Sequence, residues 1–322
     1  MRFYSLIFTF ATIAFTPTSL DAKGLETSAP GTMPAATAAA DNGNEKIETR
    51  VLDLKDFHGL NINSVGEIYY TRGNEYRVEA SGTAKAFRQT GILVKDGLLT
   101  TKQNENKGQG FDGNIKMEPL TLRIVSPSLD VLINAGYITF HTSEISSADF
   151  KLGNSGDLIF DMQAFVCRSI DITNSGNLQM KCSISADNYE QGNSGNSNIK
   201  ADYNIKNSFK YTNSGSTEIS GTLTASYVEI NNSGSFAPAM TINADTLKSV
   251  TSGETKADIY YKGGKADIVC SGNGDFNMKV DCQDLSTFAS GNLKVKIAGT
   301  ADNVKLDGSG RSNVDMTQLN NF

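Results

Sequence analysis

A Ser-Gly pair recurs at nearly constant spacing through the C-terminal two thirds of the sequence. Successive glycines lie 19 or 20 residues apart, and the glycine of an upstream Asn-Ala-Gly stretch continues the series. A fixed period near twenty residues is typical of a solenoid, in which each repeat stacks on its neighbours. The glycines of the series are Gly136, Gly156, Gly176, Gly195, Gly215, Gly234, Gly253, Gly272, Gly291 and Gly310.

Apolar and polar residues alternate on both sides of these glycines. After Gly291, for example, Leu293, Val295 and Ile297 are separated by asparagine and lysine. Alternation with period two indicates short strands with one face inward. The frames of leucine-rich repeats and of calcium-binding nonapeptide repeats are missing. We therefore predict an all-β fold, a single-stranded parallel β-helix of 19–20 residues per turn, which is right-handed because parallel crossovers nearly always are.

Asparagine occupies one inward position, two residues before the glycine, in six consecutive repeats. Stacked amides can donate to and accept from the repeats above and below, which satisfies polar groups inside a tight corner. Glycine at the corner tolerates positive φ and allows close approach of neighbouring backbones. We interpret the motif as structural, and later repeats replace asparagine with Thr251, Cys270, Ala289 and Gly308. The predicted ladder is Asn134, Asn154, Asn174, Asn193, Asn213 and Asn232.

The N-terminus is typical of an export signal. Arg2 precedes a short apolar stretch at residues 3–15, and small and polar residues suited to cleavage follow. The apolar stretch is short for a membrane span, and no cysteine follows it, so we predict a cleaved signal rather than a lipoprotein. We assign residues 1–22 to the signal, 23–48 to a flexible tether and 49–322 to the β-helix, and expect a periplasmic, surface or extracellular protein.

Residues 51–125 are strand-like but less regular than the repeats. The stretch "ILVKDGLLTTKQ" predicts a hairpin with Asp96 and Gly97 at its turn. Residues 104–119 form a polar, glycine-rich segment, for which we predict a loop. We expect the strands of this region to begin the coil and to cap its first turn, because an open solenoid end exposes strand edges.

The order of these elements resembles the putative auto-transporter adhesin, head GIN domain family of Bacteroidetes. The likeness rests on "FHGLNINSVGEIYYTRGNEYRVEASG", "GILVKDGLLTTKQ", "LTLRIVSPSLDVLINAG" and the serial Ser-Gly corners, and it covers about residues 51–310. The resemblance implies a β-helical cell-envelope or surface protein of adhesin type. It brings no catalytic motif that could be carried over to residues of this chain.

Several function classes find little support in the sequence. A net charge of −6, without a basic stripe interleaved with aromatics, argues against nucleic acid as a partner. His58 and His141 lack metal-site spacing, and no nucleophile elbow is present. We therefore expect no metal, no cofactor and no catalytic site.

The four cysteines do not share one column of the predicted coil. Cys167 and Cys182 lie 15 residues apart in a turn of about 20, while Cys182 and Cys270 point inward in different columns. We expect packed free thiols, although an exported protein meets oxidising conditions.

The outward positions leave an enzymatic alternative open. His141, Asp161, Lys181 and Lys200 share one outward position on successive turns. Such Asp/Lys ladders are what a β-helical polysaccharide lyase or hydrolase would need, but they are also what any soluble parallel sheet favours. The second set is Lys256, Asp275 and Lys294, beside Asp258 and Lys296.

Outward polar residues give a hint of sugar binding. The polar strip includes Asn177, Asn196, Asn198 and Ser216. Most aromatics fall at inward positions, and the candidates for outward exceptions are Tyr137, Tyr69 or Tyr70, and Phe288. We expect a non-enzymatic adhesin or assembly module whose partner is unknown, with surface glycans or envelope proteins as candidates. Weak end-to-end self-association is also expected, since no capping helix follows the last turn.

Overall fold

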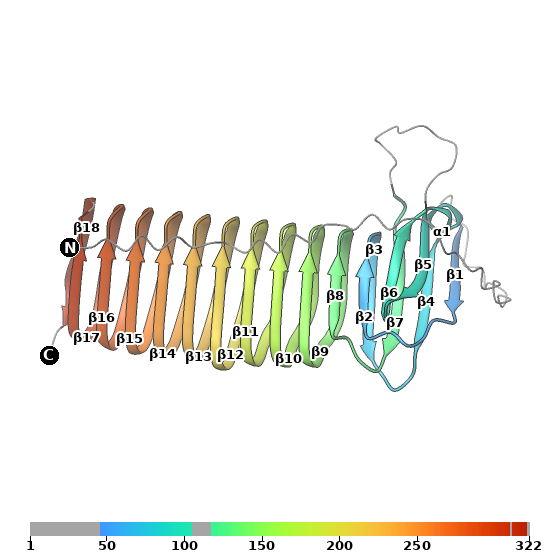
Figure 1. Cartoon of the computed structure of the whole chain (residues 1–322), viewed down its shortest axis with the longest axis horizontal. Coiled ribbons are helices and arrows are strands. Elements are labelled where there is room, and N and C mark those ends of the chain that lie inside the picture. Colours follow the sequence, from blue (N-terminus) through green and yellow to red (C-terminus); the bar gives the residue numbers. More distant parts are fainter. Residues whose placement is uncertain (1–45, 105–116, 310, 321–322) are drawn as a thin grey trace. The chain divides into compact units, whose positions relative to one another are not determined.

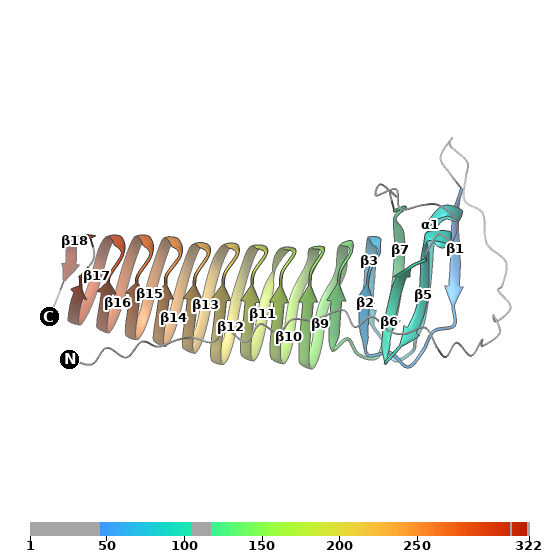
Figure 2. The same cartoon turned by 45° about the horizontal axis from the view of Figure 1, so that its top comes forward.

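The computed structural model describes residues 46–104, 117–309 and 311–320, and strands make up most of these residues. It is an all-β solenoid of about ten turns with mostly parallel pairing, which confirms the predicted fold class. Each turn, or rung, is one long strand, and the rungs lie side by side (Figures 1 and 2). The strands are β8 (Val131–Asn134), β9 (Tyr137–Asn154), β10 (Asp157–Asn174), β11 (Asn177–Asn193), β12 (Asn196–Asn213), β13 (Ser216–Asn232), β14 (Ser235–Thr251), β15 (Glu254–Cys270), β16 (Asn273–Ala289), β17 (Asn292–Gly308) and β18 (Arg311–Asn320).

Shorter elements precede these strands in the described residues. They are β1 (Ile47–Leu52), β2 (Gly59–Ile62), β3 (Val65–Arg72), β4 (Arg77–Thr83), α1 (Ala84–Gln89), β5 (Thr90–Lys95), β6 (Leu98–Gln103) and β7 (Leu120–Ser126). No helix among the described residues is long and apolar enough to cross a bilayer.

The N-terminal strands start the coil and cover its first end. β2 and β3 pair in parallel with β8 and β9 on one side and with β6 and β7 on the other. β4 then pairs antiparallel with both β7 and β1, and β5 pairs antiparallel with β6. The chain therefore runs outward from its first rung and returns before the regular coil begins, so antiparallel strands cap this end.

The local elements of the cap follow sequence signals of different strength. Asp96 and Gly97 have φ values of 52° and 74°, which suit a two-residue hairpin turn, and this confirms the predicted hairpin. Helix α1 was not predicted. Its signal is Thr83, whose hydroxyl accepts a hydrogen bond from the Ala86 N–H at 3.0 Å.

Some sequence predictions fall wholly or partly outside the described residues. The signal and residues 23–45 of the tether lie there, as do residues 105–116 of the polar loop and Gly310. β1 begins at Ile47, within the last residues assigned to the tether.

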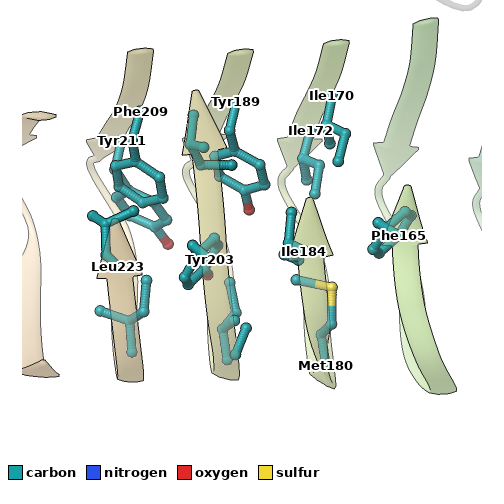
Figure 3. Packing of buried hydrophobic residues seen from close by; sticks show 14 of the residues in the cluster. Phe165, Ile170, Ile172, Met180, Ile184, Tyr189, Tyr203, Phe209, Tyr211 and Leu223 are labelled. Carbon is teal, nitrogen blue, oxygen red and sulfur yellow. The ribbon is translucent and has the colours of Figure 1, made fainter. Parts of the chain in front are cut away.

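The interior of the coil is a set of stacked apolar and aromatic columns (Figure 3). The rings of Tyr189 and Phe209, on adjacent rungs, stack with centroids 5.1 Å apart, and Phe209 also contacts Tyr203 and Tyr211. All four side chains are at most 2% exposed. Burying such a side chain contributes about 1.5–3 kcal/mol to folding, so each rung is stabilised mainly by its two neighbours.

The six asparagines of the predicted ladder form one buried column at the corner. The Nδ2 group of each asparagine donates to Oδ1 of the next, at 2.7–2.9 Å, from Asn134 to Asn232. Nδ2 also donates to the carbonyl oxygen of its own corner glycine, at 3.0–3.2 Å. These carbonyl oxygens also accept a backbone N–H from the next rung, so each amide supplies a second donor at the corner.

The column changes its chemistry after Asn232. Its Nδ2 group donates to Thr251 Oγ1 at 3.0 Å, and Thr251 in turn bonds Thr255 at 2.8 Å. The next rungs carry Cys270 and Ala289 at this position, both buried. The corner therefore keeps its shape while its interior passes from hydrogen-bonded amides to small side chains.

The corner glycines are required for close approach and not for positive φ. None of those described has φ in the left-handed region. Instead, a Cβ atom on Gly195 would lie 2.1 Å from the carbonyl oxygen of Gly176, and the other corners repeat this geometry. The expectation of close approach was right, whereas the tolerance of positive φ plays no part at these positions.

Replacing a corner glycine should destabilise the coil because the added Cβ meets a backbone carbonyl group that cannot move. For Gly195→Ala we expect a loss of about 3 kcal/mol in the free energy of unfolding, measured by urea denaturation. Gly192→Ala is a matched control three residues away, since its Cβ meets nothing within 4 Å. The control should change stability by less than about 0.5 kcal/mol. Equal effects of the two substitutions would contradict the close-approach argument.

Breaking the amide column at its centre should also cost stability. Asn193→Ala removes two buried bonds of the column, from Asn174 Nδ2 and to Asn213 Oδ1, and each is worth about 0.5–1.5 kcal/mol. Asn303→Ala is the control, because Asn303 makes an exposed bond of 2.9 Å to Asp284 on the neighbouring rung. Urea denaturation should show a clear loss for the first variant and a change within about 0.5 kcal/mol for the second.

Candidate functional site: a polar groove across the rungs

Two columns of outward side chains stand next to each other on the face that follows the corner glycines. The strand register places equivalent residues of successive rungs side by side, with strands about 4.8 Å apart. The first column is Tyr137, Asp157, Asn177, Asn196 and Ser216. The second column is Ile159, Gln179, Asn198 and Glu218.

A groove of about 500 Å³, the post-corner groove, is lined by these two columns. Leu158, Leu178 and Ser197, at the inward position between the columns, also line it and are nearly buried. Because the lining residues come from five successive rungs, the groove runs across the strands and along the coil axis. A ligand in it would meet the same strand positions again at every rung.

Hydrogen bonds between rungs hold the amides of the post-corner groove. Asn177 Nδ2 donates to Asp157 Oδ1, and Asn196 Nδ2 donates to Asn177 Oδ1 at 2.8 Å. In the second column, Asn198 Nδ2 donates to Glu218 Oε2 at 3.3 Å. Each NH₂ group has two N–H donors, so these bonds orient the amide and leave further hydrogen-bonding capacity for a ligand.

Apolar side chains gather at one end of the groove. Tyr137 is 64% exposed and Ile159 is 42% exposed, on adjacent rungs. An exposed aromatic ring beside ordered amides can contact one apolar face of a ligand while the amides bond its polar edge. The site therefore combines one exposed aromatic ring, amides and carboxylates.

The structure brings together most of the residues singled out for sugar binding. Asn177, Asn196, Asn198 and Ser216 line the groove, and Tyr137 stands at its end. Sequence reasoning missed Asp157, Ile159, Gln179 and Glu218 as partners, although they occupy the same two repeat positions and could have been found from the register.

The other aromatic candidates lie elsewhere. Tyr70 is 4% exposed and belongs to the core, so of the two neighbours only Tyr69 faces outward. Phe288 is 43% exposed, but it precedes a corner rather than following one, so it lies outside the groove.

A second groove, of about 820 Å³, occupies the same two columns further along the coil. Lys256, Asp275 and Lys294 follow one another in register along it, as their common position predicted, and Lys294 Nζ lies 3.8 Å from Asp275 Oδ2. Asn277 separates Asp258 from Lys296 in the neighbouring column, so these two residues are not direct neighbours.

The predicted ladder of His141, Asp161, Lys181 and Lys200 continues a longer outward column. His141 Nδ1 lies 2.8 Å from Asp161 Oδ2, and its ring stacks on Tyr69 with centroids 4.4 Å apart. The column parallels the post-corner groove, and Asp161, Lys181 and Lys200 line a depression of their own. The four residues are in register as predicted. The contacts at this end of the column are the pair of His141 with Asp161 and the stacking of His141 on Tyr69.

The remaining candidates are structural. The ladder asparagines lie beneath the corner, where they are at most 4% exposed. Within the described ranges, no group of three or more His, Cys, Asp or Glu side chains is arranged to hold a metal ion. All four cysteines are free thiols, and burial raises the pKa of Cys182 to about 12 and the pKa of Cys167 and Cys282 to about 11.

The family with the description "Putative auto-transporter adhesin, head GIN domain" matches residues 56–202 and 240–321, more than half of the sequence. The chain belongs to this family. Membership confirms the resemblance noted in the sequence, and it supports an adhesin-type role for this head GIN domain protein. A comparison with curated proteins found no match.

Solved structures of similar proteins include putative adhesins from Parabacteroides and Bacteroides species. A putative adhesin from Parabacteroides merdae ATCC 43184 is 16% identical, with 85% of this chain and 98% of that chain covered and a TM-score of 0.41. A putative adhesin from Bacteroides fragilis NCTC 9343 is 14% identical, with coverage of 85% and 98% and a TM-score of 0.39. At these values, nothing about ligand or activity of the head GIN domain protein follows from the likeness.

The raised thiol pKa values predict weaker stability at alkaline pH. Unfolded thiols ionise near their ordinary pKa of 9, whereas Cys182 ionises near 12 in the folded chain. The folded state therefore holds more protons above pH 9, and stability should fall as pH rises from 9 to 12. Melting temperatures across this range should fall less steeply for Cys182→Ala than for the unchanged protein.

All four thiols should react with a thiol reagent after denaturation, and fewer than four would contradict the free-thiol state.

Proposed function

We propose that the protein is an exported, non-enzymatic module of the cell envelope or surface that adheres to a glycan through the post-corner groove. The observation that carries the proposal is the array of oriented amides ending at exposed Tyr137. Membership in a family described as adhesins supports the same reading. The signal-like N-terminus of the sequence supports export.

The chemistry of the groove suits sugar hydroxyl groups. A hydroxyl group both donates and accepts, and so does a side-chain amide. Asn177 and Asn196 are already fixed by bonds to their neighbours, so binding a ligand would cost them little conformational entropy. The carboxylate of Asp157 accepts only, and it complements the donor side of a sugar hydroxyl.

The apolar end of the groove suits the ring of a sugar. A pyranose presents C–H groups on its faces and hydroxyl groups around its edge. The ring of Tyr137 offers a flat apolar surface to such a face, and Ile159 extends that surface onto the next rung. Desolvating these two exposed side chains would add apolar binding energy to the hydrogen bonds of the amides.

A polysaccharide lyase or hydrolase is the competing function. Asp161, Lys181 and Lys200 line a depression beside the groove, where an acid–base pair could act on a bound chain. The Asp161 carboxylate pairs with His141 there, an arrangement that also serves a surface ladder of opposite charges. Release of shorter chains from a bound polysaccharide would favour the enzyme and overturn the non-enzymatic proposal.

Removing the aromatic ring at the end of the groove should weaken glycan binding. The purified protein is incubated with fluorescent polysaccharides and separated by size exclusion, where binding shifts the label to larger size. For Tyr137→Ala we expect affinity to fall by about tenfold, corresponding to about 1.4 kcal/mol, while the melting temperature is unchanged. Phe288→Ala removes an exposed aromatic ring outside the groove and should bind as the unchanged protein does. Equal losses in both variants would argue against the groove as the site.

A further inference from the structure

The second groove is collinear with the post-corner groove. Ser216 pairs with Ser235, and Ser235 pairs with Glu254, so the first column continues unbroken from one groove into the other. In the second column Glu218 pairs with Ala237. Phe236 pairs with Thr255 and Ala239 pairs with Asp258, so Ala237 lies beside Lys256 on the next rung. Both grooves are thus made by the same two repeat positions of one parallel sheet.

The rung between the two grooves presents only small outward side chains. Ser235, Ala237 and Ala239 occupy its outward positions there, and neither groove includes them in its lining. Small side chains leave the surface low at this rung, so they do not obstruct a chain that passes from one groove to the other. The continuous track runs over ten strand positions from Tyr137 to Arg311, about 43 Å at a strand spacing of about 4.8 Å.

We propose that a single extended, neutral, β-1,4-linked polysaccharide chain occupies both grooves, with its long axis across the strands. This inference rests on the proposed function, and it adds the shape, linkage and charge of the ligand. It assigns the second groove, which the proposed function leaves without a role, to the same ligand as the first.

The regular spacing of the rungs carries the argument for an extended ligand. Amides recur in the first column at Asn177, Asn196, Asn273 and Asn292, always one residue after a corner glycine. A flat β-1,4-linked ribbon places its hydroxyl groups at regular intervals along a straight line, as this column does. An α-1,4-linked chain coils, so it would leave the straight track after a few sugars.

The charges along the track carry the argument for a neutral ligand. Within the post-corner groove, the charged side chains are the carboxylates of Asp157 and Glu218, without a lysine or arginine. The second groove carries the cations of Lys256, Lys294 and Arg311 beside the carboxylates of Glu254 and Asp275, so opposite charges nearly balance there, and Lys294 lies 3.8 Å from Asp275. A uronic acid chain would therefore meet uncompensated carboxylates in half of its track, and like charges disfavour binding.

The experiment compares short and long probes on variants matched by position. Asn177 and Asn292 occupy the same column, one in each groove, and each donates Nδ2 to the preceding rung. Asn303 makes the same kind of bond, to Asp284, outside both grooves. Titration calorimetry would measure binding of β-1,4-linked mannotetraose and xylotetraose and of the corresponding soluble polymers. Maltotetraose and soluble amylose test the linkage, and polygalacturonate tests the charge.

We expect the polymers to bind at least about tenfold more tightly than the tetraoses, because engagement of the second groove becomes intramolecular. Asn177→Ala and Asn292→Ala should each remove this gain, whereas Asn303→Ala should keep it. Unchanged polymer affinity in Asn292→Ala, or equal binding of amylose or polygalacturonate, would overturn the inference while the proposed glycan binding stands. Failure of every glycan to bind the unchanged protein would overturn the proposed function itself.

Discussion

Close stacking of backbone on backbone at the corner is the constraint on which the rest of the structure depends. The carbonyl oxygen of each corner glycine lies where the Cβ atom of any other residue on the next rung would stand, as at Gly176 and Gly195. The hydrogen-bond ladder can therefore pass through the corner without a break, for example from the Asn196 N–H to the Gly176 carbonyl oxygen at 2.8 Å. Once this approach is fixed, the register of the residues that follow the corner is fixed with it, as far as irregularities such as the one between Asp161 and Ala164.

The close approach at the corner has different consequences for the side chains inside the coil and for those on its outer face. Inside, the corner tolerates amides, hydroxyls or small apolar groups, provided that polar groups are paired, as the passage from Asn232 to Thr251 and Cys270 shows. Outside, side chains are held in straight columns at the spacing of the strands. A surface of this kind suits a ligand that is itself periodic, which is why the grooves and the proposed polysaccharide belong together.

The N-terminal cap differs from the regular coil because some of its strands pair antiparallel. There β4 runs antiparallel to β1 and β7, and α1 follows β4 directly. The antiparallel layer pairs the outer edges of β6 and β7 within the chain, and the strands that then end the sheet, β1 and β5, are only six residues long. The cap thus gives the regular rungs a defined starting point, and Tyr137 and its groove begin one rung beyond β3.

The sequence by itself determined the period, the parallel stacking and the inward position of the asparagines. It could do so because a corner that only glycine fits requires a glycine at the same position of each repeat. It also indicated Asn177, Asn196 and Tyr137, since outward residues follow from the same alternation. The tertiary structure decided the rest. The repeat register gives the outward positions of Glu218 and Ile159, but only the packing of neighbouring rungs makes them border a groove. Helix α1 forms from too short a stretch for periodicity to reveal. Which outward columns border a groove depends on side-chain size across neighbouring rungs, and a pattern read along one strand does not contain that information.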